Sequence, residues 1–154
     1  ITFFEPVKNR RRNPSMHLVL DTNIVMDMFH FDDPFTRPLG EALREKRVRC
    51  YTDADCLAEL ERVTGYPEFR LDSAGRRALL EQYTRLATRC DGGLPENILL
   101  PRCRDRDDQK FLILAARCHA DLLITRDKLL LRLMRNRHHP PPCPIVTAKD
   151  WCQA

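Results

Sequence analysis

The sequence lacks a long apolar run, a Cys-x-x-Cys pair and a strong excess of charge of either sign. No apolar stretch approaches the roughly 20 residues that span a bilayer, and nothing near the start has the layout of a secretory signal. We therefore expect a soluble, cytoplasmic protein with no membrane contact. Seven cysteines without a close pair favour reduced thiols over a disulfide framework.

The five histidines form no zinc-binding pattern either. The nearest approach is His138 and His139 followed by two cysteines, but the prolines at 140–142 favour an exposed loop. The net charge of +4 is modest for a chain in which 31% of residues are charged. A basic surface around an acidic pocket would suit a polyanionic substrate.

The length of 154 residues and the 43% hydrophobic content predict one domain with one core, covering residues 16–154. Residues 1–15 differ from the rest, because a basic cluster ending at Arg12 lies between prolines without apolar periodicity. This segment is either a tag or extension ahead of a natural start at Met16, or a basic arm that contacts RNA.

The chain is organised around a short apolar run, residues 17–20, that stops at Asp21. Apolar residues then recur at helical spacing from Ile24 to Phe29, so Asp21 lies where a strand gives way to a helix. In open α/β sheets that position faces the ligand crevice. The alternative is that Asp21 simply caps the helix.

Short apolar segments alternate with amphipathic helical segments along the whole chain. The segments predicted to be strands are residues 17–20, 47–52, 98–100, 122–125 and 144–147. This alternation predicts an α/β fold, a three-layer α/β/α sandwich around a five-stranded parallel sheet. Parallel strands end on one rim, so Asp21 and Asp127, each directly after a strand, would share that rim.

Further acids accompany the predicted helices. Glu59 shares a helical face with apolar neighbours such as Leu60 and Val63, although it could simply lie at the edge of a buried stripe. Three carboxylates between Asp105 and Asp108 precede another helix, and some of them complement its dipole. Three acids are more than a cap requires.

Carboxylates that converge on one crevice repel each other. Two unit charges about 4 Å apart cost roughly 1 kcal/mol in water and about 4 kcal/mol near a protein surface. A divalent cation would remove this repulsion, and all-oxygen ligation suits Mg²⁺ or Mn²⁺ rather than zinc. Such a metal can orient a phosphodiester and activate water.

Four motifs in order resemble those of the PIN-domain ribonucleases. They are Leu20–Asn23, Glu59–Leu60, Asp105–Asp108 ahead of Phe111, and Leu123–Asp127. The stretch from Cys103 to Phe111 is similar, more narrowly, to the VapC-like toxin branch of bacterial toxin–antitoxin systems. The match runs from about Leu18 to about Trp151. The resemblance implies a Mg²⁺- or Mn²⁺-dependent endoribonuclease acting on single-stranded RNA, with a cognate antitoxin and often a homodimer.

By position, the resemblance assigns metal binding and catalysis to Asp21, Glu59, Asp108 and Asp127. Asn23 and Thr125 would position water or a carboxylate. Asp105 and Asp107 compete with Asp108 for the third acidic position.

Two residues depart from the family pattern. Arg106 replaces the proline usual between the acids, and Arg126 replaces the glycine usual before the last acid. Neither is a ligand, so these changes bear on substrate access and on charge at the rim.

Two other functional classes are compatible with an acid at a strand end. A phosphoaspartyl enzyme is disfavoured, because the phosphatases of that type carry a second acid two residues later and this chain has Asn23 there. A catalytically inactive RNA- or protein-binding module on the same fold is the stronger alternative.

Overall fold

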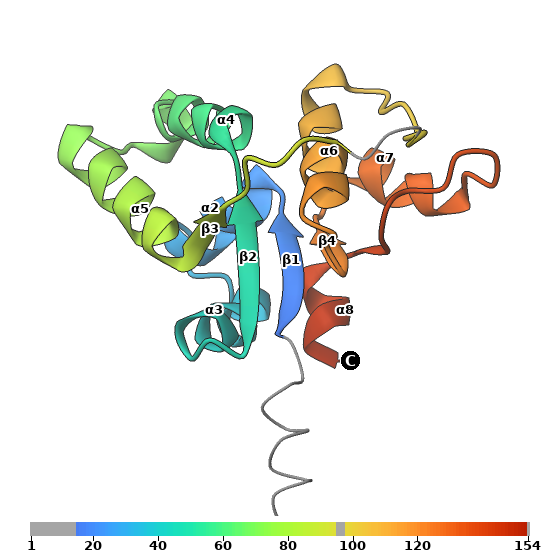
Figure 1. Cartoon of the computed structure of the whole chain (residues 1–154). Coiled ribbons are helices and arrows are strands. Elements are labelled where there is room, and N and C mark those ends of the chain that lie inside the picture. Colours follow the sequence, from blue (N-terminus) through green and yellow to red (C-terminus); the bar gives the residue numbers. More distant parts are fainter. Residues whose placement is uncertain (1–14, 95–97, 154) are drawn as a thin grey trace, which may run out of the picture.

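Five parallel strands form one sheet in the centre of the computed structural model, which describes residues 15–94 and 98–153 (Figure 1). The strands are β1 (Met16–Leu20), β2 (Val48–Thr52), β3 (Ala87–Arg89), β4 (Leu122–Ile124) and β5 (Ile145–Val146). They lie in the order β3-β2-β1-β4-β5, and each neighbouring pair is parallel. The basic arm predicted for residues 1–15 lies outside the described residues, except for its last residue.

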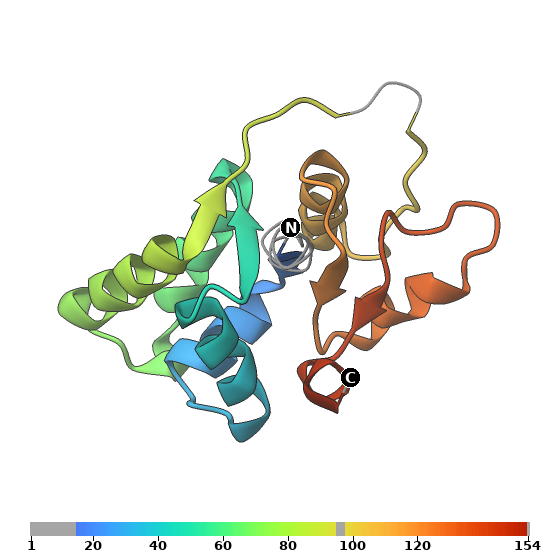
Figure 2. The ribbon, with the colours of Figure 1, turned by 60° about the horizontal axis from the view of Figure 1, so that its bottom comes forward.

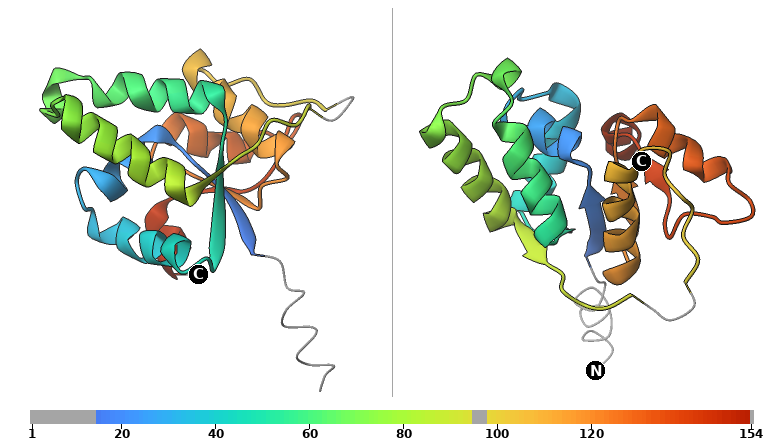
Figure 3. Two further views of the ribbon diagram at one scale, coloured as in Figure 1. Left: turned by 60° about the vertical axis from the view of Figure 1, so that its left-hand side comes forward. Right: turned by 90° about the horizontal axis from the view of Figure 1, so that it is seen from above.

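The helices connect and cover the strands. They are α2 (Thr22–Phe29), α3 (Arg37–Arg44), α4 (Ala54–Thr64), α5 (Ser73–Leu86), α6 (Gln109–Arg117), α7 (Lys128–Leu131) and α8 (Ala148–Gln153). Short 3-10 turns are η1 (Pro34–Thr36), η2 (Pro67–Phe69), η3 (Arg106–Asp108) and η4 (Arg132–Arg135). The long helices α4 and α5 each begin directly after an aspartate, because the side chains of Asp53 and Asp72 cap them by accepting backbone N–H groups (Figure 3, left).

The alternation of side chains along β1 places an apolar core on each face of the sheet. Leu18 and Leu20 point to a core built with α2, α3, α5 and α8, whereas Val19 points to a second core built with α6 and α7. All three residues are almost completely buried. Figure 2 also shows α4 and α5 on one side of the molecule and α6 and α7 on the other. The predicted three-layer α/β/α fold with five parallel strands is confirmed.

The predicted third strand is wrong in its position. The structure places β3 at Ala87–Arg89, directly after α5, and residues 98–100 have no regular structure. Ala87 pairs with Cys50 of β2, so the chain joins the sheet as soon as the helix ends. Because β3 is an exposed edge strand, its residues need no apolar run, and the apolar residues at 98–100 gave a misleading signal.

The sequence predicts reduced cysteines and no segment that spans a membrane. All seven cysteines are free. In the part of the chain that the structure describes, every helix is too short or too polar to cross a membrane.

Candidate active site

The candidate site lies where β1 and β4, neighbours in the middle of the sheet, reach their carboxyl ends. Leu20 is in register with Ile124, and the Asp21 N–H continues the pairing by donating to the Ile124 carbonyl at 3.0 Å. From β1 the chain crosses to β2 on one side, while β4 lies on the other. Such a switch in strand order opens a crevice between the loops that leave the two strands.

Thr125 connects the acids that follow these two strands. Its hydroxyl donates to Oδ2 of Asp21 at 2.7 Å and accepts the N–H of Asp127 at 3.0 Å. Thr125 is fully buried and Asp21 is 4% exposed, so the bond to Asp21 fixes that carboxylate in a site with little water. The prediction that Asp21 and Asp127 share one rim is borne out by this geometry.

Asp21 precedes α2, but its side chain makes no capping hydrogen bond. The carboxylate instead accepts from Nδ2 of Asn23 at 3.3 Å, in addition to Thr125. The buried Oδ1 of Asn23 has no partner among the described residues. Buried polar atoms are nearly always satisfied, so the unpaired amide oxygen beside a carboxylate is an acceptor that a bound cation could use.

Asp127, not Asp21, is the acid that caps a helix. Its Oδ1 accepts the Leu129 N–H at 2.8 Å at the start of α7. Its carboxyl group also acts on Asp108, whose pKa it raises through its charge and a hydrogen-bonding interaction. Asp127 therefore both caps α7 and interacts with Asp108.

The structure distinguishes among the three acids before α6. The Asp105 side chain caps η3 by accepting the Asp107 N–H at 2.9 Å, and the Asp107 side chain is exposed. Asp108 is half-buried, makes no capping hydrogen bond to α6 and reaches Asp127. Of these three acids, Asp108 is therefore the one that interacts with Asp21 and Asp127.

Burial and like charge raise the pKa of two of these carboxyl groups. Burial is the main cause for Asp21, whose pKa rises to about 6 although the Thr125 hydrogen bond opposes the change; the charges of Glu59 and Asp127 add to the rise. Burial is also the main cause for Asp108, whose pKa rises to about 7 with contributions from Asp21 and Asp127. The groups therefore repel each other as ions.

Glu59 lies beside this group, but its oxygens are engaged. Oε1 accepts from the Thr22 hydroxyl, and Oε2 forms an ion pair with Lys110 and a longer one, 3.9 Å, with Arg62. Its side chain is only 12% exposed. Glu59 therefore ties α4 to α2 and α6, while its charge still acts on Asp21.

Lys110 and Arg126 take part in the site, and the sequence reasoning assigned them no such contacts. Lys110 lies in the first turn of α6, where a cation opposes the helix dipole, and its ammonium also donates to the Asp107 carbonyl. That unfavourable position is the signal that could have singled it out. Arg126 binds the buried Asp27 through two contacts of 2.9 and 3.3 Å, which ties the loop after β4 to α2.

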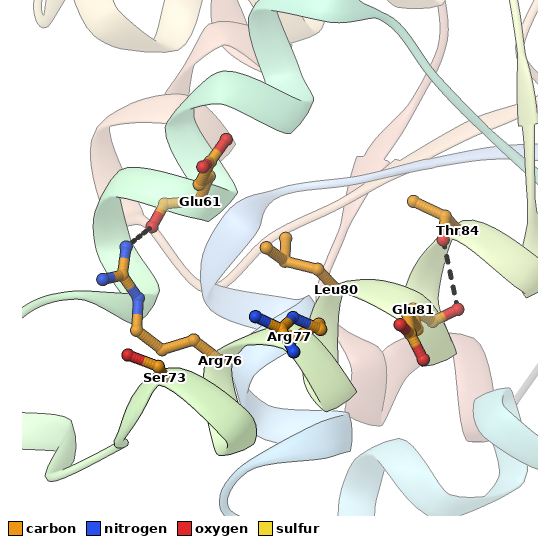
Figure 4. A pocket seen from close by; sticks show the side chains of 7 residues that line it. All are labelled: Glu61, Ser73, Arg76, Arg77, Leu80, Glu81 and Thr84. Atoms are coloured by element: carbon orange, nitrogen blue, oxygen red, sulfur yellow. Dashed lines mark hydrogen bonds between the residues drawn. The ribbon is translucent and has the colours of Figure 1, made fainter.

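A separate pocket of about 390 Å³ lies between α4 and α5, away from these acids (Figure 4). It is lined by Glu61, Ser73, Arg76, Arg77, Leu80, Glu81 and Thr84. Arg76 crosses it and donates to the Glu61 carbonyl at 3.0 Å. Glu59 and Glu61 are two residues apart on α4, yet Glu59 faces the acids and Glu61 lines this pocket.

The comparisons agree with the fold. A family model described as the PIN domain matches residues 17–129, a span that includes Asp21, Glu59, Asp108 and Asp127. A search of curated proteins finds no match. PIN domains are generally nucleases and typically use divalent metal ions. Because the match covers more than half of the chain, the protein belongs to the PIN-domain family.

Proposed function

We propose that the protein is a divalent-metal-dependent endoribonuclease that hydrolyses phosphodiester bonds in single-stranded RNA. The observation that carries this proposal is the meeting of Asp21, Asp108 and Asp127 at the adjacent ends of β1 and β4. A nuclease site needs clustered carboxylates at a crevice, and a purely structural cluster gains nothing from the burial and like charge that raise two of the pKa values.

The residues fit Mg²⁺ or Mn²⁺ in their chemistry. The donors are carboxylate oxygens and the unpaired amide oxygen of Asn23, which hard cations prefer. When bound, the metal would orient the phosphate, activate water and stabilise the leaving oxygen. Thr125 would hold the Asp21 carboxylate in place, and Glu59 would act on Asp21 through its charge.

The described residues contain no group of three acidic, histidine or cysteine side chains already placed to hold a metal ion. The pKa of Asp108 is raised to about 7, so this carboxyl group holds a proton more readily than an ordinary aspartate. A cation would have to compete with that proton. This arrangement, with Lys110 already neutralising Glu59, favours the second candidate function, an inactive RNA- or protein-binding module.

The narrower role is the toxin of a toxin–antitoxin pair, with a cognate antitoxin and a homodimeric assembly. Its support is the similarity of the stretch from Cys103 to Phe111 to the VapC-like branch. The toxin role and the nuclease activity are separate proposals, so the protein could cleave RNA without having an antitoxin.

Cleavage by the purified protein tests the nuclease proposal. Labelled single-stranded RNA should be cut with Mg²⁺ or Mn²⁺ and left intact in EDTA, and Asp127→Asn should lose at least about a hundredfold in rate, as expected when a metal ligand is removed. Asn caps helices nearly as well as Asp, so the variant should keep α7. Single-stranded DNA of the same sequence is the substrate control. RNA binding without cleavage under any metal would instead identify the inactive module.

A further inference from the structure

A hollow lined by arginines adjoins the candidate active site. It encloses about 570 Å³, and its main lining residues are Arg102, Arg104, Arg106, Arg132, Leu129 and Leu133. A neighbouring hollow shares Arg102 and Arg106 and extends to Leu100 and Gln109. The lining comes from the segment that leads into η3 and from α7 and η4, which are far apart in the sequence.

The arginines of this hollow are exposed and have no ion-pair partner among the described residues. Some other surface arginines do form ion pairs, such as Arg37 with Asp32 and Arg47 with Glu45. Four guanidinium groups around one hollow form a site for a polyanion.

The wall of the hollow is continuous with the acids. The N–H of Leu129, which lines the hollow, binds the Asp127 carboxylate at 2.8 Å. Arg106 belongs to η3, the turn that ends at Asp108. A chain lying in the hollow would therefore pass directly to the candidate reacting carboxylates.

We propose that this arginine hollow binds the sugar–phosphate backbone of the RNA strand next to the bond that is cut. Arginine forks match phosphate oxygens, and the exposed apolar side chain of Leu129, beside the partly buried Leu133, suits unstacked bases of a single strand. An acidic protein segment would satisfy the arginines, but it would not account for a wall shared with Asp127. The inference rests on the proposed function and adds the path of the substrate.

Binding of a fluorescein-labelled oligouridine, followed by anisotropy in EDTA over a range of salt concentrations, tests the proposal without cleavage. Each phosphate contact on a single strand contributes a slope of roughly 0.7 in log affinity against log salt, so replacing all four arginines by Gln should reduce the slope by up to about 3. Affinity at low salt should fall about tenfold or more. Arg77→Gln, in the pocket between α4 and α5, is the matched control and should retain the wild-type slope.

The outcomes separate this inference from the nuclease proposal. A wild-type slope in the fourfold variant, with unchanged thermal unfolding, would overturn the role of the hollow even if the protein cuts RNA. The expected loss of slope would support it even if the protein cuts nothing. Labelled polyglutamate of equal charge is the second probe. Binding of that peptide as tight as that of RNA, and equally dependent on the four arginines, would assign the hollow to an acidic protein instead.

Discussion

Asp21 is held by contacts that differ from those of a helix cap. Its carboxylate accepts from the Thr125 hydroxyl and the Asn23 amide, and makes no capping bond to α2. Burial and the nearby charges of Glu59 and Asp127 raise its pKa to about 6. An acid kept buried among other acids costs stability, which is typical of residues retained for function.

Replacement of Asp21 separates the functional role from a structural one. Asp21→Asn keeps the shape but removes a charge and a metal ligand, so cleavage should collapse. Without metal, the free energy of unfolding should stay level or rise by about 1 kcal/mol, because the neighbouring acids lose a like charge. Urea unfolding in EDTA and RNA cleavage measure the two effects.

Asp21→Ala is the companion variant, because Asn can substitute for Asp as a cap and Ala cannot. Ala also leaves the buried Thr125 hydroxyl without an acceptor, so we expect it to lose activity and to be less stable in EDTA than the Asn variant by about 1–3 kcal/mol. Strong destabilisation by Ala, together with an Asn variant that still cuts RNA, would make Asp21 structural and refute the nuclease proposal.

At the scale of elements, α4 presents two glutamates to different neighbours. Glu59 contacts Thr22 of α2 and Lys110 of α6, whereas Glu61 lines the pocket towards α5. Glu59→Gln keeps an acceptor for Thr22 but loses the ion pair with Lys110. We expect cleavage to fall about tenfold or more in Glu59→Gln, and within about twofold of wild type in Glu61→Gln, because interactions with surface charges are weak.

Initial cleavage rates, with circular dichroism to confirm folding, decide this comparison. Glu61→Gln is the matched control, since it makes the same chemical change two residues away on the same helix. Equal losses in the two variants, or a larger loss at Glu61, would show that the helical face facing the site has been assigned incorrectly.

The elements that the sequence predicted well are those whose burial leaves a pattern. The buried strand β1 and the helix starts capped by Asp53 and Asp72 follow from apolar runs and capping residues. The exposed edge strand β3 leaves no such pattern, and its position follows from pairing with Cys50 far away in the chain. Local signals could not supply that contact.

In the candidate site, too, the sequence predicted the residues that follow a local pattern and missed those that depend on contacts between distant elements. The order of the acids along the chain pointed to Asp21 and Asp127, since parallel strands bring their ends together. Spacing alone could not choose among the acids at 105–108, because Asp108 differs from the others by its contact with Asp127. The bonds of Lys110 to Glu59 and of Arg126 to Asp27 join distant elements and were likewise inaccessible.

At the scale of the whole molecule, the charges are segregated. The chain carries a net charge of +4, yet carboxylates gather at the ends of β1 and β4, beside arginines that have no ion-pair partner among the described residues. The arginines would attract a polyanion to the rim, and a bound cation would stabilise the carboxylates in the centre. Folding must therefore tolerate the central repulsion whenever no cation is bound.

The burial and like charge of these acids predict how stability depends on pH in the absence of metal. The pKa of Asp21 rises to about 6 and that of Asp108 to about 7, from an ordinary value of 3.8. The folded protein therefore holds more protons than the unfolded chain between about pH 4 and pH 7. The stabilisation from these two groups is complete below pH 4 and is lost as the pH rises through 6 and 7.

Urea unfolding in EDTA at pH 5 and pH 8 should thus show a decrease in stability with pH that is smaller in Asp108→Asn than in wild type. Asp105→Asn is the control, because Asn can replace Asp105 as the cap of η3, and it should keep most of the wild-type decrease. Saturating Mn²⁺ should reverse the trend, since the metal competes with protons for the same oxygens and stabilises only the folded state. A wild-type pH dependence in Asp108→Asn would contradict the proposed interaction of the acids, and a melting temperature unaffected by Mn²⁺ at pH 8 would contradict the metal site.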